Sequence, residues 1–152
     1  MKATKSAPAA NGVKVKLLTD AAQLPTYGTE GAACFDIYAT DTVAIATGRA
    51  ATISTGIAME VPAGHALMLY SRSGHGYKNG LRLANCVGVI DSDYRGEVCV
   101  RLQNDGKDTY IVQQGERIAQ AMIVPVPRFD LVKADALSET DRGEGGFGST
   151  GK

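Results

Sequence analysis

Short apolar stretches, repeatedly broken by glycine, proline, asparagine or aspartate, are the feature that most restricts the fold of this chain. Several stretches alternate apolar and polar residues, which is typical of β-strands with one buried face. The 18 glycines among 152 residues also disfavour long helices. We predict strands at Val13–Leu17, Ala33–Tyr38, Val43–Ile45, Ala51–Ser54, Ile57–Val61, Ala66–Tyr70, Leu81–Leu83, Val98–Gln103, Tyr110–Val112 and Ile118–Val126. The pattern predicts an all-β domain, a barrel or jelly roll.

Helix-favouring residues are confined to Ala121–Met122 and the region 134–139, so we expect one short helix. A chain of 152 residues without internal repeats fits one domain. We expect a flexible segment at 1–12, a barrel domain at 13–138 and a mobile glycine-rich tail at 139–152.

The composition restricts the partners and the compartment. Sixteen basic and sixteen acidic side chains cancel, which disfavours binding to a nucleic-acid backbone. No stretch approaches the ~20 apolar residues of a membrane span, and residues 1–11 lack the apolar core of a signal peptide. Cys34, Cys86 and Cys99 lie in apolar runs without the paired spacing of a zinc site, which indicates buried, reduced thiols. We therefore expect a cytoplasmic protein without nucleic-acid or membrane partners.

Three segments depart from strand and turn, and the first is Ser71–Gly74. Here a predicted strand delivers a guanidinium, a hydroxyl and free backbone N–H groups to one turn, as a phosphate oxygen requires. The alternative is a polar turn in which Ser73 caps the short segment Tyr77–Asn79.

The second segment is the tail, where Arg142 and the hydroxyls of Ser149 and Thr150 accompany flexible glycines. Such a tail could wrap around an anion, although glycine-rich ends are commonly disordered linkers. Phe147 favours the first interpretation, because a flexible tail has no packing use for a large aromatic, whereas a nucleobase offers a face for stacking.

The third segment runs from Gly88 to Glu97, where a hairpin of small residues that begins at Asn85 leads into an acidic turn. Asp91 and Asp93 could simply bind nearby backbone N–H groups, as in most turns of this composition. However, the apolar pair Val89–Ile90 would place Asp91 at the edge of the core, where a carboxylate can hold and deprotonate a water molecule.

Together these segments resemble, in order and spacing, the homotrimeric all-β dUTPase family, the deoxyuridine triphosphate nucleotidohydrolases. The resemblance covers residues 13 to 151 and implies a distorted jelly roll of the β-clip type. It is carried by five motifs: Ala33–Ile37, Ser71–Gly74, Gly88–Gly96, Gly115–Ala121 and Arg142–Gly151.

The resemblance implies a reaction. Asp91 would activate a water that attacks the α-phosphate of dUTP, releasing dUMP and pyrophosphate, and Gln120 would lie beside this water. The triphosphate would carry Mg²⁺, with Asp36 reaching the ion through water. This activity keeps uracil out of DNA and supplies dUMP for thymidylate synthesis.

The resemblance also implies a substrate site shared by three chains. Asn85 and the main chain of Val89, Ile90 and Cys99 would read uracil, and Tyr94 would exclude a 2′-hydroxyl. Phosphates would be held by Arg72, Ser73 and Gly74. The tail would close as a lid, with Phe147 and Gly148 over uracil and with Arg142, Ser149 and Thr150 at the γ-phosphate.

Two residues depart from the family pattern, Cys34 in place of a common glycine and His75 in place of a common leucine. We expect His75 to be an exposed turn residue that removes no catalytic group. The alternatives are a dCTP deaminase of the same superfamily and a catalytically silent binding or regulatory protein. The complete tail and Asp91 argue against the first, and Asp91, Tyr94, Arg142 and Phe147 argue against the second.

Overall fold

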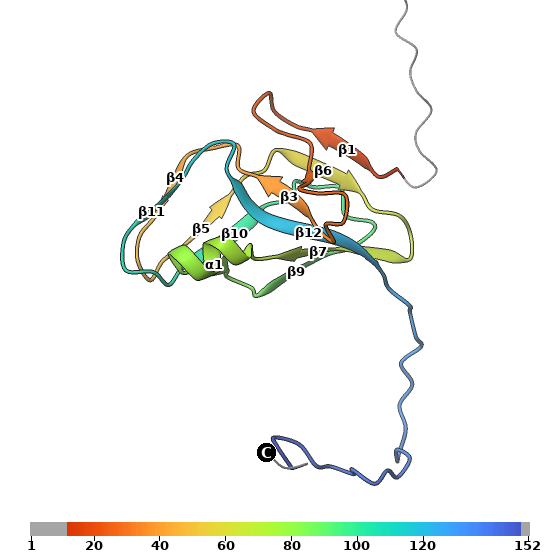
Figure 1. Cartoon of the computed structure of the whole chain (residues 1–152). Helices are drawn as coiled ribbons and strands as arrows, with labels where there is room; N and C mark the ends of the chain where they lie inside the picture. Colours follow the sequence, from red (N-terminus) through yellow and green to blue (C-terminus); the bar gives the residue numbers. More distant parts are fainter. Residues whose placement is uncertain (1–11, 150–152) are drawn as a thin grey trace, which may run out of the picture.

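Strands with one buried face dominate the computed structural model, which describes residues 12–149. In β10, Val100, Leu102 and Asn104 are buried and the residues between them point outwards, as the two-residue period of a strand requires. The strands are β1 (Lys14–Leu17), β2 (Thr26–Tyr27), β3 (Phe35–Tyr38), β4 (Val43–Ile45), β5 (Ala50–Ile53), β6 (Ile57–Glu60), β7 (His65–Tyr70), β8 (Leu81–Leu83), β9 (Val87–Ile90), β10 (Val100–Asn104), β11 (Tyr110–Val112) and β12 (Arg117–Pro125). Helix α1 spans Ser73–Asn79, and Figure 1 shows the arrangement.

The strands form four antiparallel sheets around one core. The largest sheet has the order β2-β3-β12-β7-β9, a second has the order β5-β10-β8, and β1-β6 and β11-β4 form pairs. Ile37, Ile45, Ile57 and Leu102, one residue from each sheet, are at most 2% exposed and belong to a single hydrophobic cluster. This shared core makes the strands one domain.

The predicted strands are all present, with bounds that differ by one or two residues at some ends. The sequence prediction missed β2 and β9. It also placed a hairpin around Asn85, which is wrong, because β8 pairs with β10 whereas β9 pairs with β7. The turn at Asn85 and Cys86 therefore connects two sheets, and Cys86 adopts a left-handed backbone with φ of 63°.

One short helix is confirmed, but its position was predicted wrongly. Ala121 and Met122 belong to β12 and pair with β7, and the region 134–139 contains no helix. Helix α1 instead follows β7 directly, although Gly74 and Gly76 lie within it. Its N-cap is Arg72 without a side-chain cap, so the alternative in which Ser73 caps a helical turn is also wrong.

The cysteines are free thiols, as predicted, but they are not all buried. Cys86 and Cys99 are exposed and Cys34 is partly exposed. The prediction failed because apolar neighbours along a strand do not specify which face of the strand a thiol occupies.

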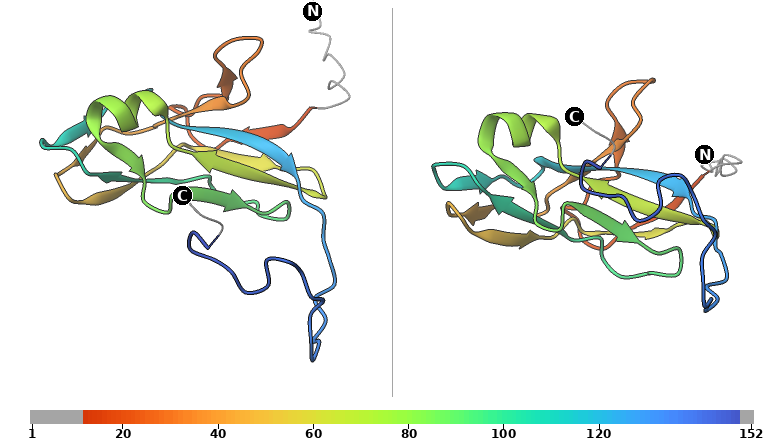
Figure 2. Two further views of the ribbon diagram at one scale, coloured as in Figure 1. Left: turned by 60° about the horizontal axis from the view of Figure 1, so that its bottom comes forward. Right: turned by 90° about the horizontal axis from the view of Figure 1, so that it is seen from below.

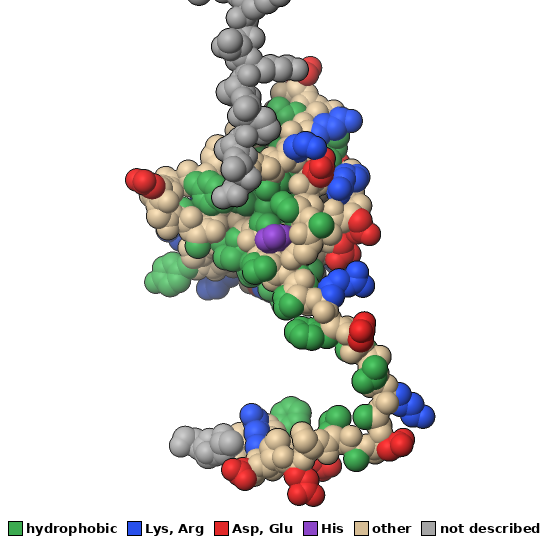
Figure 3. All heavy atoms as spheres, turned by 90° about the vertical axis from the view of Figure 1, so that its right-hand side faces the viewer, with side chains coloured by type: hydrophobic (Ala, Val, Ile, Leu, Met, Phe, Trp, Pro, Cys, Tyr) green, Lys and Arg blue, Asp and Glu red, His purple; other side chains and the backbone are tan. Residues whose placement is uncertain are grey.

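The segment after β12 leaves the barrel at the end opposite to α1 and extends away from it (Figures 1 and 2). Its large hydrophobic residues are uncovered, with Phe129, Leu131, Val132 and Leu137 between 79% and 97% exposed. Figure 3 shows hydrophobic side chains along this segment and on the barrel face from which it departs. Among the described residues, no helix is long and apolar enough to cross a membrane.

Candidate active site

Asp36 and two arginines form a charged cluster at the end of the largest sheet where β12 begins and β7 ends. Asp36 lies on β3 and is largely buried. Its Oδ1 accepts a hydrogen bond from Arg72 Nε at 3.0 Å, and its Oδ2 accepts one from Arg117 Nη1 at 3.2 Å. Arg72 Nη1 also donates to the main-chain oxygen of Arg117 at 3.2 Å. The guanidinium of Arg72 is thereby held in one orientation at the start of α1.

Gln120 joins this cluster through the register of β12. It pairs with Asp36 of β3 on one side and with Tyr70 of β7 on the other. Its Nε2 donates to the main-chain oxygen of Ser71 at 3.0 Å. Ser73 and Gly74 follow at the exposed first turn of α1. The structure therefore brings together the residues predicted to hold phosphate and Gln120.

His75 is buried at 8% exposure beneath this turn, so the prediction of an exposed histidine is wrong. Its Nε2 lies 2.9 Å from the main-chain oxygen of Arg117 and 3.4 Å from Glu116 Oε1. Tyr110 packs edge-on against the imidazole and donates its hydroxyl to Glu116 at 2.6 Å. Burial, followed by the hydrogen bond and charge of Glu116, raises the pKa of Tyr110 to about 12. Tyr110 is therefore a neutral donor at physiological pH.

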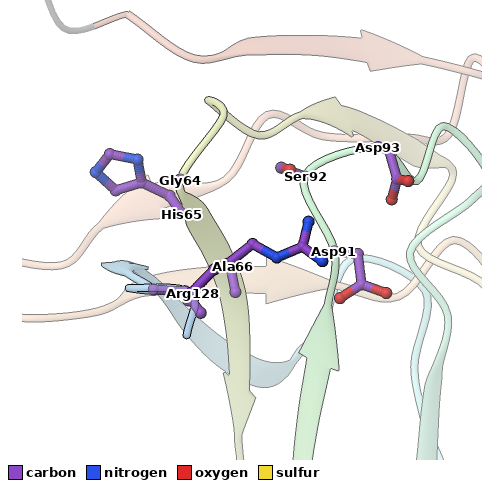
Figure 4. A pocket seen from close by; sticks show the side chains of 8 residues that line it. Gly64, His65, Ala66, Asp91, Ser92, Asp93 and Arg128 are labelled. Atoms are coloured by element: carbon purple, nitrogen blue, oxygen red, sulfur yellow. The ribbon is translucent and has the colours of Figure 1, made fainter. Parts of the chain in front are cut away.

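Asp91 belongs to a second group of residues, at the exit of β9. It is exposed and lines an open hollow of about 450 Å³ together with Gly64, His65, Ala66 and Arg128, among others. In Figure 4 the Arg128 side chain extends toward the Asp91 carboxylate, whereas the His65 ring points away. A carboxylate in such a hollow is accessible to water and to a substrate.

Tyr94 and Glu97 shape the turn that follows Asp91. Tyr94 N–H donates to the main-chain oxygen of Asp91 at 3.2 Å, and the Tyr94 hydroxyl donates to the main-chain oxygen of Glu97 at 3.0 Å. Glu97 Oε1 accepts from the N–H groups of Thr55 and Gly56 at 3.1 and 2.8 Å, which ties the turn to the barrel. The Tyr94 ring, 46% exposed, is thus held at the surface.

Three of the four residues predicted to read uracil have exposed side chains. Asn85, Val89 and Cys99 are exposed, and Ile90 is partly buried against the core. Desolvation by the surrounding protein, followed by repulsion from Glu97, raises the pKa of the Cys99 thiol. The reactive thiolate is therefore disfavoured, in agreement with a role for the main chain of Cys99 and not for its sulfur.

The two groups of residues lie apart within one chain. Strand β9 runs antiparallel to β7, and Ile90 pairs with Leu67, so Asp91 lies near the beginning of β7. Arg72 follows the end of β7. The six residue-to-residue steps from Ala66 to Arg72 span roughly 20 Å in an extended chain. Asp91 and Arg72 of one chain are therefore too far apart to contact the same phosphate group.

The tail residues form a third group, away from both others (Figure 2). Arg142 Nε donates to the main-chain oxygen of Gly145 at 2.8 Å, and Ser149 N–H donates to that of Gly146 at 3.0 Å. Phe147 is fully exposed, with φ of 51°. Gly148 follows it, also with positive φ, and Thr150 lies outside the described residues.

Asp36 is the candidate residue for a metal ion. Within residues 12–149 no group of three or more His, Cys, Asp or Glu side chains is arranged to hold a metal. Both Asp36 oxygens already accept guanidinium N–H groups, but each retains a second lone pair. Asp36 can therefore still accept a hydrogen bond from a water in the shell of an ion that other ligands hold.

The sequence prediction missed three residues of these groups: Arg117, Glu97 and Arg128. Arg117 and Glu97 lie within or beside the recognised motifs, but their partners, Asp36 and the Thr55–Gly56 backbone, are distant in sequence. Arg128 lies outside every motif, and nothing in its local sequence distinguishes it from a solvated arginine. Only the folding of the chain brings it near Asp91.

Comparisons of sequence identify relatives over nearly the whole chain. A family model described as dUTPase matches residues 20–151. Deoxyuridine 5'-triphosphate nucleotidohydrolase of Nautilia profundicola is 43% identical over 140 residues, which cover 92% of this chain and 99% of the relative. The enzyme of the same name from Desulfitobacterium hafniense is 47% identical over 148 residues, covering 93% and 98%.

Solved structures match the fold as well. The dUTPase of Staphylococcus bacteriophage 80alpha with dUPNHPP has a TM-score of 0.88 at 30% identity and covers 93% of this chain and 99% of its own. A point mutant of the dUTPase from phage phi11 of S. aureus, described as revealing the coordination of a structural Mg(II) ion, has a TM-score of 0.79 at 26% identity, covering 85% and 100%. These matches confirm the predicted all-β fold class.

Proposed function

The chain belongs to the dUTPase family and hydrolyses dUTP, and we propose that Asp91 is the base that activates the attacking water. The observation that carries this assignment is the position of Asp91, exposed at the end of β9 in a hollow that a substrate can enter. A carboxylate there can accept a proton from water while the water attacks the α-phosphorus. The products are dUMP and pyrophosphate.

Arg72, Ser73 and Gly74 bind the phosphates in this proposal, and Gln120 lies beside them. The support is the orientation of Arg72, which Asp36 and the Arg117 carbonyl hold without using every N–H of the guanidinium. Its remaining donors are available to phosphate oxygens. Because the guanidinium is already ordered, little conformational entropy is lost when the phosphate binds.

Mg²⁺ accompanies the triphosphate in this proposal and is held mainly by phosphate oxygens. The donor set fits such an ion, because Asp36 can reach it through water whereas no cage of protein ligands is found in residues 12–149. When bound, the ion neutralises charge that develops on the leaving pyrophosphate.

Tyr94 selects the sugar and the main chain near Asn85, Val89, Ile90 and Cys99 selects the base. The Tyr94 hydroxyl donates to the main-chain oxygen of Glu97, which holds the ring in place, and the side chain remains partly exposed to solvent. A ring fixed in this way leaves no room for a 2′-hydroxyl on a ribose that packs against it.

We also propose that three chains share each site. Within one chain, Asp91 and Arg72 lie near opposite ends of β7, and the C-terminal segment that contains Arg142 and Phe147 extends away from the barrel (Figure 1). The segment between β12 and the tail exposes Phe129, Leu131 and Val132, which a neighbouring chain would cover. In the complete assembly, the tail of one chain closes over the substrate bound by others.

Pyrophosphate release measured with dUTP, UTP, dTTP and dCTP tests the substrate assignment. We expect turnover of dUTP to exceed that of the other three by at least about two orders of magnitude, since sugar and base are both selected by shape and hydrogen bonding. Ammonia release from dCTP, without turnover of dUTP, would instead identify a deaminase.

A further inference from the structure

The main-chain oxygen of Arg117 accepts hydrogen bonds from two side chains at the start of α1, those of Arg72 and His75. Arg72 Nη1 approaches it at 3.2 Å and His75 Nε2 at 2.9 Å. Arg117 begins β12 beside an irregularity of register between Arg117 and Ala119. Such a bulge turns backbone groups out of the regular ladder, which makes this carbonyl accessible to side-chain donors.

Three residues contact the imidazole of His75 and fix its orientation: Arg117, Asn79 and Tyr110. Because a carbonyl oxygen only accepts, Nε2 carries a proton, and Nδ1 lies 3.5 Å from Asn79 Nδ2. Tyr110 packs edge-on against the ring with centroids 5.7 Å apart. Tyr110 and the N–H of Gln113 both donate to Glu116, which fixes the turn that precedes Arg117.

We propose that His75 is a positioning residue for phosphate binding, acting through the Arg117 carbonyl on the guanidinium of Arg72. It does not touch the substrate. Without the imidazole, the carbonyl loses one of its two side-chain donors and is less firmly oriented, which weakens one of the two anchors of Arg72 while Asp36 remains. This inference rests on the proposed role of Arg72 in binding phosphate.

Three variants of the full-length enzyme test the role of the imidazole donor. His75→Gln places an amide donor where Nε2 lies, whereas the shorter His75→Asn leaves the Arg117 carbonyl with Arg72 as its side-chain donor, and His75→Leu removes all polarity. We expect His75→Asn and His75→Leu to raise KM for dUTP about fivefold, the effect of losing one hydrogen bond, with a smaller change in kcat. His75→Gln should restore most of the affinity. Lys78→Gln, at an exposed position of the same helix, is the matched control.

A double-mutant cycle with Arg72→Ala separates positioning from general stability. If His75 acts through Arg72, then His75→Asn should leave KM unchanged once Arg72→Ala is present. Equal fold-changes in KM with and without Arg72, accompanied by equal losses of Tm, would overturn the inference. An unchanged KM in His75→Asn alone, or in Arg72→Ala alone, would also overturn it.

The same experiment distinguishes failure of this inference from failure of the proposed function. A wild-type enzyme that releases no pyrophosphate from dUTP contradicts the function itself. An active wild type with full affinity in His75→Asn contradicts only the role of His75. If His75→Leu does not fold, the comparison of His75→Asn with His75→Gln decides the outcome, because both retain a polar side chain.

Discussion

Asp91 and Tyr94 lie three residues apart and have different structural supports. Asp91 follows β9 and lines the hollow, whereas Tyr94 is fixed by Glu97, which the Thr55–Gly56 backbone holds in turn. The proposed base needs access to a water molecule, whereas selection of a sugar by shape requires a ring that does not move. The two residues can therefore be tested separately.

Replacing Asp91 by Asn should lower kcat by about two to four orders of magnitude, the usual contribution of a general base. Affinity for a non-hydrolysable dUTP analogue should change little, since the amide has the same shape as the carboxylate. Pyrophosphate release and equilibrium binding measure the two quantities. Asp93→Asn in the same turn is the control, and an equal loss of kcat there would contradict the assignment of Asp91.

Gly96 has no space for a side chain, because a Cβ there would lie 2.5 Å from Tyr94 Cζ. Gly96→Ala should therefore push the Tyr94 ring away and break its hydrogen bond to Glu97. We expect the preference for dUTP over UTP to fall by about tenfold, measured as the ratio of kcat/KM values. If the preference stays at the wild-type value, the position of Tyr94 does not control sugar selection.

At the scale of elements, β12 brings together the cluster of Asp36, Arg72, Arg117 and Gln120. It is the central strand between β3 and β7, so Gln120 pairs with Asp36 on one side and Tyr70 on the other. Helix α1 continues from β7 at the same end, and its glycines give it little intrinsic helicity. The helix is held by tertiary contacts, His75 beneath it and Gly80 at its C-terminus.

Gly80 ends α1 with φ of 67°, and an added Cβ would lie 2.7 Å from the backbone nitrogen of Gly106. Gly80→Ala should therefore combine left-handed strain with a clash against the backbone. Gly48→Ala is the matched control, because Gly48 has φ of 71° but open space around it. We expect the control to cost roughly 1–2 kcal/mol of unfolding free energy and Gly80→Ala clearly more. Denaturant unfolding measures both, and equal losses would rule out the clash.

At the scale of the whole molecule, the fold of one chain keeps apart the residues that the proposed reaction brings together. Asp91 and Arg72 lie near opposite ends of β7, and the tail projects from the end of the barrel opposite to α1 (Figure 1). A second and a third copy can supply the missing groups only if each site lies between chains. Sharing of sites thus has a direct experimental signature.

Two inactive variants should complement each other. We expect Asp91→Asn and a chain truncated after Asp141 to be nearly inactive alone, and to recover a measurable fraction of dUTP turnover when refolded together. In the mixed assembly some sites combine an intact Asp91 from one chain with an intact tail from another. A mixture of Asp91→Asn and Asp91→Ala is the control and should stay inactive. Mixed trimers, verified by mass, that recover no turnover would contradict sharing between these two groups.

Local patterns in the sequence were sufficient to predict most strands and the residues of the candidate site. Alternation of apolar residues located the ten predicted strands, because burial of one face follows directly from the two-residue period. The motifs assigned Asp36, Arg72, Ser73 and Gln120 to one substrate site, and the structure brings these residues together. The assignment of roles to them, and the division into segments at residues 12 and 138, stay predictions.

Pairing over long distances in the chain was decided only by the tertiary structure. No local signal indicates that β9 pairs with β7 and not with β8, although this choice places Asp91 far from Arg72. Helix α1 and the burial of His75 likewise depend on an acceptor 42 residues away, the Arg117 carbonyl. Sequence by itself determined which residues have the chemistry, because side-chain type is local. Which of them meet within one chain depends on strand order, which is set by packing of the entire core.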